Sequence, residues 1–315
     1  MQYRQLGKSG TRVSVIGLGT NRFGTDAVSQ ETVNTIITAA QERGVNFIDT
    51  ANVYQQGKSE ERLGVALKGR WDKFVVATKF RFSMGEGTND VGASRYHLMN
   101  ALDASLRRLQ TDHIDLLYVH GWDEQTPIEE TLRALDDVVR MGKVRYVGAS
   151  QFAAWQLAYS NLLAQMQDWS PFVVITAGYH MFERFVEQEM LPYCRAHHVG
   201  LVPFFPLAGG FLTGKYQRGK PAPAGSRGES SSYVQKYMTD AHYTQVEKLT
   251  AWAEAHGHTM SQLAHAWLLA QPAVCSVISG ATSLDQFLAN VQAGDWSLIE
   301  SETQEVNEIL GGSVK

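Results

Sequence analysis

The sequence is poor in cysteine, in excess charge of either sign and in long apolar runs. Its 315 residues include two cysteines, Cys194 and Cys275, too few for a disulfide framework or a cysteine-ligated zinc site. The 28 basic and 32 acidic residues leave a net charge of −4, which excludes the strongly basic surface of a general nucleic-acid-binding protein. No apolar stretch approaches the ~18 residues of a transmembrane helix, so no membrane partner is predicted.

Signals for secretion and for metal binding are also missing. The first ten residues, MQYRQLGKSG, contain no apolar core of a signal peptide, and together with the few cysteines this predicts a cytoplasmic location. The paired histidines at 197–198 and the histidines at 256 and 258 are not part of a set of cysteines and acids with the spacing of a metal site. No metal site is therefore expected.

What the sequence does contain is a series of eight short apolar runs rich in Val and Ile. Each run is nearly continuous rather than alternating, which is typical of strands buried on both faces in a parallel sheet. The runs occupy residues 13–19, 46–50, 74–79, 114–120, 144–150, 172–178, 199–205 and 276–281.

Segments with helical periodicity separate these runs. They lie at about 31–44, 59–69, 97–109, 126–142, 153–167, 185–198, 240–270 and 283–293, and a further helix is expected at 300–311. Ser59 is placed to cap one helix, and Thr126 with Glu129 has the spacing of a capping box. Eight strands alternating with helices predict a (β/α)8 TIM barrel, as one domain over residues 1–315.

Two glycine-rich segments suggest nucleotide-binding motifs, but each lacks a required residue. The first strand ends in Gly17 and Gly19, yet Arg22 stands where a GxGxxG motif has its third glycine. Residues 209–215 read GxxxxGK, but Tyr216 replaces the Ser or Thr that would hold magnesium. We therefore expect neither a doubly wound dinucleotide-binding fold nor nucleotide hydrolysis.

Four of the predicted strands end in a polar residue. These are Asp49, Lys79, His120 and Ser150. In a TIM barrel the active site lies at the carboxyl ends of the strands, and charged groups buried there must find partners. Tyr54 follows Asp49 by five residues and can reach the same pocket. The sequence thus predicts a site in which these side chains converge.

The chemistry of these residues suits proton donation. A free tyrosine has a pKa of about 10, too high for an acid at neutral pH. A nearby Lys79 ammonium would lower the pKa of Tyr54 by favouring the phenolate, and Asp49 would keep Lys79 charged. His120 would hydrogen-bond the same carbonyl oxygen or relay a proton. A structural ion-pair network is the alternative.

The motifs DTANVYQQGKSEERLG, VVATK, DLLYVH and GAS, in this order, resemble the aldo-keto reductase superfamily. The resemblance runs from LGKSGTRVSVIGLGT to SGATSLDQFLAN, nearly the whole chain. It implies a barrel with an N-terminal β-hairpin and extra C-terminal helices, which binds NADP(H) or NAD(H) and passes hydride to a carbonyl carbon. It also implies a catalytic tetrad of Asp49, Tyr54, Lys79 and His120, with Tyr54 as the general acid.

The resemblance further implies a set of cofactor contacts. Ser150 matches the serine that holds the nicotinamide carboxamide, Gln151 stands where the family usually has Asn, and Thr176 where it usually has Gln. NADP(H) is expected rather than NAD(H), with Ser283, Gln286 and Arg227 as donors for its 2′-phosphate. The expected set is Gly19, Thr20, Asp49, Ser150, Gln151, Thr176, Phe204, Pro206, Leu207, Gly209, Lys215, Arg227, Gly280, Thr282, Gln286 and Asn290.

Several of these residues also have a structural interpretation. Ser150 could cap a helix, Phe204 could belong to the core, and Gln286 with Ser283 has capping-box spacing. Residues 216–240, rich in Pro, Gly and Ser, are expected to form a surface segment that folds over the cofactor.

For the substrate, we expect contacts with Asn21, Tyr54, His120 and Trp122. Asn21 stands where many relatives carry a bulky aromatic, and this together with the polar loop at 81–94 favours polar carbonyls such as sugars or small ketoaldehydes. Two other functions remain open. One is a slow or inert NADPH-binding regulatory subunit, similar to potassium-channel β subunits. The other is a Schiff-base lyase with Lys79 as nucleophile.

Overall fold

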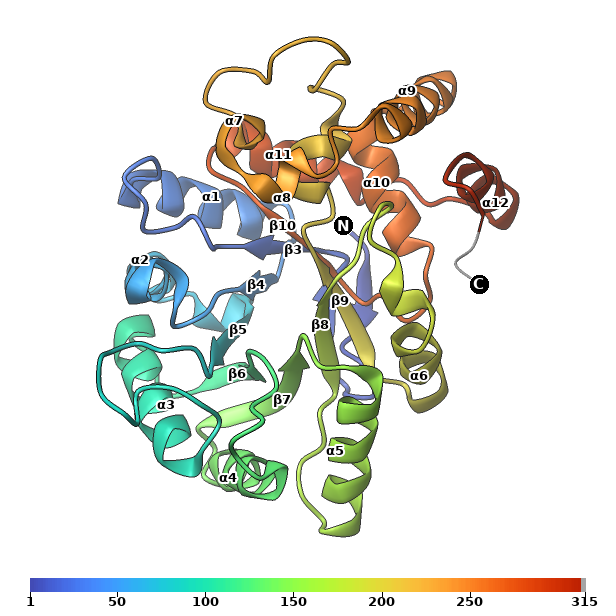
Figure 1. Cartoon of the computed structure of the whole chain (residues 1–315). Helices are drawn as coiled ribbons and strands as arrows, with labels where there is room; N and C mark the ends of the chain where they lie inside the picture. The colour runs from blue at the N-terminus through green and yellow to red at the C-terminus, as the bar shows by residue number, and fades with distance from the viewer. Residues whose placement is uncertain (313–315) are drawn as a thin grey trace.

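The computed structural model describes residues 1–312 and contains a closed barrel of eight parallel strands with helices around it (Figure 1). The neighbouring strands run in the order β10-β3-β4-β5-β6-β7-β8-β9. Their bounds are β3 (Ile16–Gly19), β4 (Phe47–Asp49), β5 (Val75–Phe80), β6 (Ile114–Val119), β7 (Val144–Ser150), β8 (Val174–Gly178), β9 (Gly200–Phe204) and β10 (Val277–Gly280). The predicted (β/α)8 TIM barrel is confirmed.

A two-stranded antiparallel hairpin precedes the barrel. It consists of β1 (Tyr3–Gln5) and β2 (Arg12–Ser14), so the predicted run 13–19 is divided between the hairpin and the first barrel strand. Leu6 and Val13 are buried and pack with core residues of the barrel interior. At Gly7, whose φ is +58°, a Cβ would lie 2.0 Å from a backbone oxygen. Only glycine therefore lets the hairpin close one end of the barrel.

Helices cover the outside of the barrel. The long ones are α1 (Gln30–Glu42), α2 (Lys58–Leu67), α3 (Arg95–Leu109), α4 (Ile128–Arg140), α5 (Ala154–Met166), α6 (Met190–His197), α9 (Asp240–Ala255), α10 (Met260–Leu269), α11 (Leu284–Ala293) and α12 (Glu300–Ile309). The helix predicted at 240–270 is thus two helices, because Gly257 takes a φ of +79° and Thr259 caps α10. Within residues 1–312, no helix is both long and apolar enough to cross a bilayer.

Short helical turns occupy several loops. They are η1 (Tyr54–Gly57), η2 (Trp71–Lys73), η3 (Phe185–Glu187), η4 (Ala208–Thr213), α7 (Arg227–Ser230) and α8 (Ser232–Gln235). The segment predicted at 216–240 is therefore partly helical. Its α8 is held down by Val234, which is fully buried and packs where a Cβ on Gly209 would clash.

Two predicted helix caps are wrong. Ser59 does not cap α2, because Gly57 holds that position and Ser59 is buried in the first turn. Thr126 does not cap α4 either: Pro127 takes the cap position, and the Thr126 hydroxyl donates to Asp123 instead. The Ser59 hydroxyl bonds to Thr20 in a distant segment, whereas the Thr126 hydroxyl is taken by Asp123 three residues earlier in the same loop.

Candidate functional site

The carboxyl ends of the strands open into a pocket of about 240 Å³. It is lined by Gly19, Thr20, Asn21, Asp49, Tyr54, Lys79, His120, Ser150, Gln151, Thr176, Phe204, Phe205, Ile278 and Gly280. All but two of these were predicted from the sequence. Phe205 and Ile278 were missed because both lie in apolar runs that look like ordinary core.

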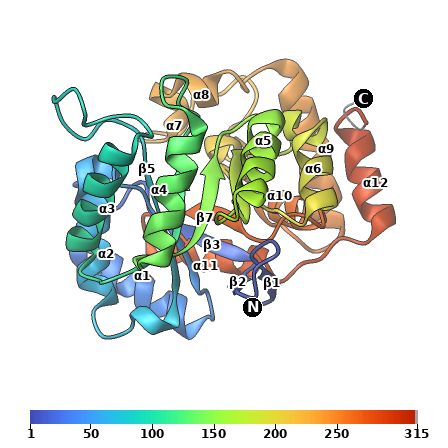
Figure 2. The same ribbon diagram turned by 90° about the horizontal axis from the view of Figure 1, so that it is seen from below.

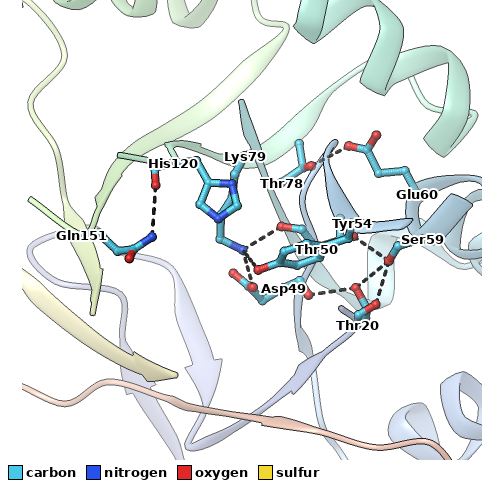
Figure 3. A network of polar contacts seen from close by, with 10 residues as sticks. All are labelled: Thr20, Asp49, Thr50, Tyr54, Ser59, Glu60, Thr78, Lys79, His120 and Gln151. Carbon is cyan, nitrogen blue, oxygen red and sulfur yellow. Dashed lines mark hydrogen bonds and ion pairs between the residues drawn. The ribbon is translucent and has the colours of Figure 1, made fainter. Parts of the chain in front are cut away.

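Strand pairing brings the predicted tetrad together. Asp49 is the last residue of β4, and Lys79 is the last but one of β5. Both side chains point into the barrel, whereas Tyr54 comes from η1 (Figure 3). His120 directly follows β6, and its backbone N–H donates to Phe80 at 2.9 Å. Because parallel strands end at the same rim, residues far apart in the sequence share one pocket.

Lys79 is the centre of the polar cluster. Its ammonium forms an ion pair with Asp49 and donates to the Thr50 carbonyl oxygen at 2.8 Å and to the Tyr54 hydroxyl at 3.3 Å (Figure 3). Burial works to lower the pKa of Lys79, but the Asp49 carboxylate and Tyr54 outweigh it and the pKa is raised. Lys79 is therefore held as an ammonium.

The pKa of Tyr54 departs from the sequence expectation. Burial raises it above the ordinary value of 10, and the nearby Lys79 ammonium opposes that rise without reversing it. The expected lowering is thus wrong for the free protein, because the phenol is desolvated in the pocket. Tyr54 keeps its proton at neutral pH and can donate it.

His120 is neutral in this pocket. Burial first, and then the positive charges of Lys79 and Arg81, lower its pKa to about 3. The ring lies edge-on to Tyr54 with 5.9 Å between ring centroids, and its Nδ1 is buried without a hydrogen-bond partner among the described residues. A neutral imidazole carries one N–H, so His120 can donate a hydrogen bond without bringing a charge.

A buried hydroxyl network supports the tetrad, and its central residue, Ser59, was predicted only as a helix cap. The Ser59 hydroxyl donates to the Thr20 backbone oxygen at 2.9 Å and lies 2.9 Å from the Thr50 hydroxyl (Figure 3). Beside it, buried Glu60 accepts from Thr78 at 2.5 Å and from Arg108 at 2.7 Å. The start of α2 is thereby tied to the loops after β3 and β4.

A second part of the pocket wall comes from β7, β8 and β9. Ser150 does not cap a helix, since Ala153 holds the cap position of α5. Gln151 has a φ of +56°, and its backbone N–H donates to Thr176 at 3.0 Å. Phe204 lies on the pocket wall rather than in the closed core. Polar groups and an aromatic face thus line one side of the same pocket.

The other predicted cofactor residues lie outside this pocket. They are Pro206, Leu207, Gly209, Lys215, Arg227, Thr282, Gln286 and Asn290. Gly209 is in η4, Arg227 begins α7, and Thr282 precedes α11. Ser283 does cap α11, but the Gln286 side chain accepts from Thr282 instead of completing the capping box.

Two of these residues are cations without an acidic partner. Within residues 1–312, no carboxylate lies at salt-bridge distance from Lys215 or Arg227. Burial lowers the pKa of Arg227, and the positive charge of Arg22 lowers it further. A cation without a carboxylate partner favours an anion such as a phosphate group.

Trp122 and the histidine pairs are not in the pocket. The Trp122 ring packs against Phe152 and Trp155, with centroid distances of 5.2 and 5.6 Å. His256 and His258 stack on tryptophan rings, and over the described residues no group of three potential ligands could hold a metal ion.

Comparisons with known proteins agree with this geometry. A sequence model of the Aldo/keto reductase family matches residues 15–310. The chain is 39% identical over 303 residues to a probable voltage-gated potassium channel subunit beta of Arabidopsis thaliana, covering 94% of this chain and 92% of the relative. It is 35% identical over 324 residues to the uncharacterized oxidoreductase YrpG of Bacillus subtilis (strain 168), covering 99% and 97%.

The fold and the matches define an oxidoreductase of the TIM-barrel type. The chain belongs to the aldo/keto reductase family, whose members generally use NAD(P)H and act on small carbonyl compounds.

Proposed function

We propose that this protein reduces aldehydes or ketones to alcohols with NADPH, with Tyr54 as the general acid. The observation that carries the proposal is the buried cluster in which Lys79 contacts both Asp49 and Tyr54 beside a neutral His120. The whole chain, residues 1–315, is proposed to act as one domain. We place it in the cytoplasm, where its two buried thiols stay reduced.

The residues present fit a nicotinamide dinucleotide. Ser150, Gln151, Thr176 and Phe204 would hold the nicotinamide end in the pocket. The unpaired cations Lys215 and Arg227, with the glycine turn of η4, would hold the phosphates. Gly280, Thr282, Gln286 and Asn290 would hold the adenosine end, with Gln286, Ser283 and Arg227 as donors for a 2′-phosphate. When bound, the reduced cofactor supplies the hydride that the carbonyl carbon accepts.

Proton delivery is assigned to the tetrad. The Tyr54 hydroxyl donates its proton to the carbonyl oxygen as negative charge develops there, and the neutral His120 N–H donates a hydrogen bond to the same oxygen. Lys79, 3.3 Å from the Tyr54 oxygen, stabilises the phenolate that remains. Asp49 keeps Lys79 charged and oriented. The raised pKa of Tyr54 retains the proton until the oxygen becomes basic enough to take it.

Lys79 is poorly suited to the alternative role of a Schiff-base nucleophile. A nucleophilic lysine needs a lowered pKa and a free amine. Here the pKa of Lys79 is raised, and the ammonium donates to three oxygens. The hydrogen bonds and charge of Lys79 support the reductase.

For the substrate we propose a polar carbonyl. Asn21 lines the pocket, and its backbone oxygen accepts from Gln55 at 3.0 Å. The loop at 81–94 that follows β5 is largely polar and exposed. These groups would hydrogen-bond hydroxyls of a sugar or a small ketoaldehyde.

The experiment is NADPH consumption over a panel of activated aldehydes, diketones and sugars, with Tyr54→Phe beside the wild type. Loss of the acid should reduce kcat by about 10²–10⁴-fold, while NADPH binding is kept. Tyr96→Phe is the matched control, because Tyr96 is exposed on α3, and it should leave the rate unchanged. A Tyr54→Phe variant as active as wild type would refute the assignment.

A second function is favoured by the relative that is named as a potassium channel subunit. In that case the protein would bind NADPH but reduce carbonyls slowly or not at all. Tight NADPH binding without turnover by wild type on the whole panel would support this alternative.

A further inference from the structure

One helix on the outside of the barrel presents an apolar face to solvent. Five residues of α5 are exposed: Trp155, Tyr159, Leu162, Gln165 and Met166. The four large apolar side chains among them are 45–71% exposed. Their spacing of four, three and four residues places them on one face, and in Figure 2 no element lies in front of α5.

The same helix carries no charge. No Asp, Glu, Lys or Arg occurs between residues 151 and 167. The neighbouring helix α4 is the opposite: its exposed residues are Glu129, Glu130, Arg133 and Arg140, all charged. Protein interfaces have a core depleted of charge and enriched in aromatics and Met, surrounded by a polar rim. The α5 face with α4 beside it has this composition.

We propose that this face is the interface of a homodimer, in which α5 packs antiparallel against α5 of a second copy. Across a two-fold axis, residues near the axis meet their own copies. Charged side chains there would face like charges, and α5 has none. The neutral face therefore suits a second copy of this chain better than a partner chosen by charge.

The charges on α4 match the same arrangement. Glu129 and Glu130 lie at its N-terminal end, and Arg140 lies at its C-terminal end, where it is exposed while its Nε donates to buried Asp136 at 2.6 Å. Glu129 lies beside the apolar face, since the Tyr159 hydroxyl donates to it at 3.3 Å. In an antiparallel pair, the acidic end of α4 in one copy lies opposite the basic end in the other. On the side of α5 where α4 lies, opposite charges are then brought together at each end of α4.

The size of the face is adequate for the centre of an interface. Trp155 and Met166 are eleven residues apart, which is about 16 Å along a helix. Aromatic side chains bury about 150–250 Å² each, and a stable interface covers about 800 Å² per partner. The α5 face supplies the apolar centre of that area, and α4 contributes to the rim.

The test is sedimentation velocity of the full chain from 1 to 100 µM. Wild type should sediment as a dimer, and Leu162→Glu should raise the dissociation constant by about 30-fold or more. Val65→Glu is the matched control, because Val65 is exposed on α2, and it should leave the dimer intact. A monomeric wild type at 100 µM, or a dimer unaffected by Leu162→Glu, would overturn the proposal.

A cross-linking measurement identifies the face directly. Leu162→Cys should form a disulfide-linked dimer on mild oxidation, whereas Val65→Cys should not. Both native cysteines are buried, so they should not cross-link the folded protein. Thermal unfolding of each variant checks that it is folded. A dimer in which Leu162→Cys does not cross-link would use another face and refute the α5 pairing.

Discussion

The roles of single residues in the pocket follow from how burial and charge act on each one. At most 7% of the surface of Asp49, Lys79 or His120 is exposed. Charge interactions are strong in such a buried environment. The pKa of Lys79 is raised and that of His120 is lowered to about 3. One cation therefore stands beside a protonated phenol and a neutral imidazole, and each group is in the form that the proposed proton transfer needs.

This assignment predicts the pH dependence of the reaction. Between pH 5 and pH 8, kcat/KM for carbonyl reduction should show no histidine titration, because His120 with a pKa of about 3 stays neutral throughout. The rate should fall only at alkaline pH, as Tyr54, whose pKa is above its ordinary value of 10, loses its proton. The measurement is kcat/KM from pH 5 to 11 at constant ionic strength, so that the range extends past the ordinary pKa of a tyrosine. An inflection near pH 6.5 that disappears in His120→Gln would contradict the assignment.

At the level of elements, the loops that carry the tetrad are tied together by the first turn of α2. Ser59 is fully buried and bonds to groups after β3 and β4. Thr20 in turn donates from its hydroxyl to the Asp49 carbonyl oxygen at 3.0 Å. The position of Asp49 at the end of β4 thus depends on a helix that contributes no side chain to the pocket lining.

Removing the Ser59 hydroxyl should therefore affect both stability and activity. Ser59→Ala leaves the buried Thr50 hydroxyl without its hydrogen-bond partner, and an unpaired buried group costs about 1–3 kcal/mol. We expect the free energy of unfolding to fall by about 2 kcal/mol and kcat to fall as the Asp49–Lys79 pair shifts. Urea unfolding and steady-state kinetics measure these two effects. Ser301→Ala, on an exposed position of α12, is the control and should change neither quantity.

For the whole molecule, buried histidines link stability to pH. His265 is fully buried, donates from Nδ1 to the Ser261 carbonyl oxygen at 2.7 Å and lies 2.6 Å from the Ser279 hydroxyl. Burial lowers its pKa to about 4, and that of His120 to about 3. The unfolded chain binds protons at these positions near the ordinary pKa of 6.5, whereas the folded chain does not.

The free energy of unfolding should therefore be highest above pH 6.5, and it should decrease as the pH falls toward 4. Each pKa unit corresponds to 1.36 kcal/mol, so at pH 5 each histidine lowers the free energy of unfolding by about 2 kcal/mol. Urea unfolding at pH 7 and pH 5 measures the difference. His265→Asn should reduce the pH dependence whatever it does to stability at pH 7. If the difference in the free energy of unfolding between pH 7 and pH 5 is the same in that variant as in wild type, other groups are responsible.

Much of this molecule was predictable from local patterns in the chain. Continuous apolar runs mark buried parallel strands, and polar residues at their ends mark the pocket, so Asp49, Lys79 and His120 were identified together. The two helix caps failed because the Ser59 hydroxyl bonds to Thr20 in a distant segment, whereas the Thr126 hydroxyl bonds to Asp123 in its own loop. Trp122 failed as a pocket residue because it packs against Phe152 and Trp155.

The sequence by itself determined the barrel, the positions of its strands and the identity of the catalytic candidates, because backbone periodicity and strand ends are local properties. Only the tertiary structure decided the direction of the Tyr54 pKa, since that depends on how far the phenol is desolvated by segments distant in the chain. The exposed apolar face of α5 was decided there as well. Because α5 has no charged residue to mark a solvent side, only the packed barrel reveals that nothing in the described chain covers its outer face.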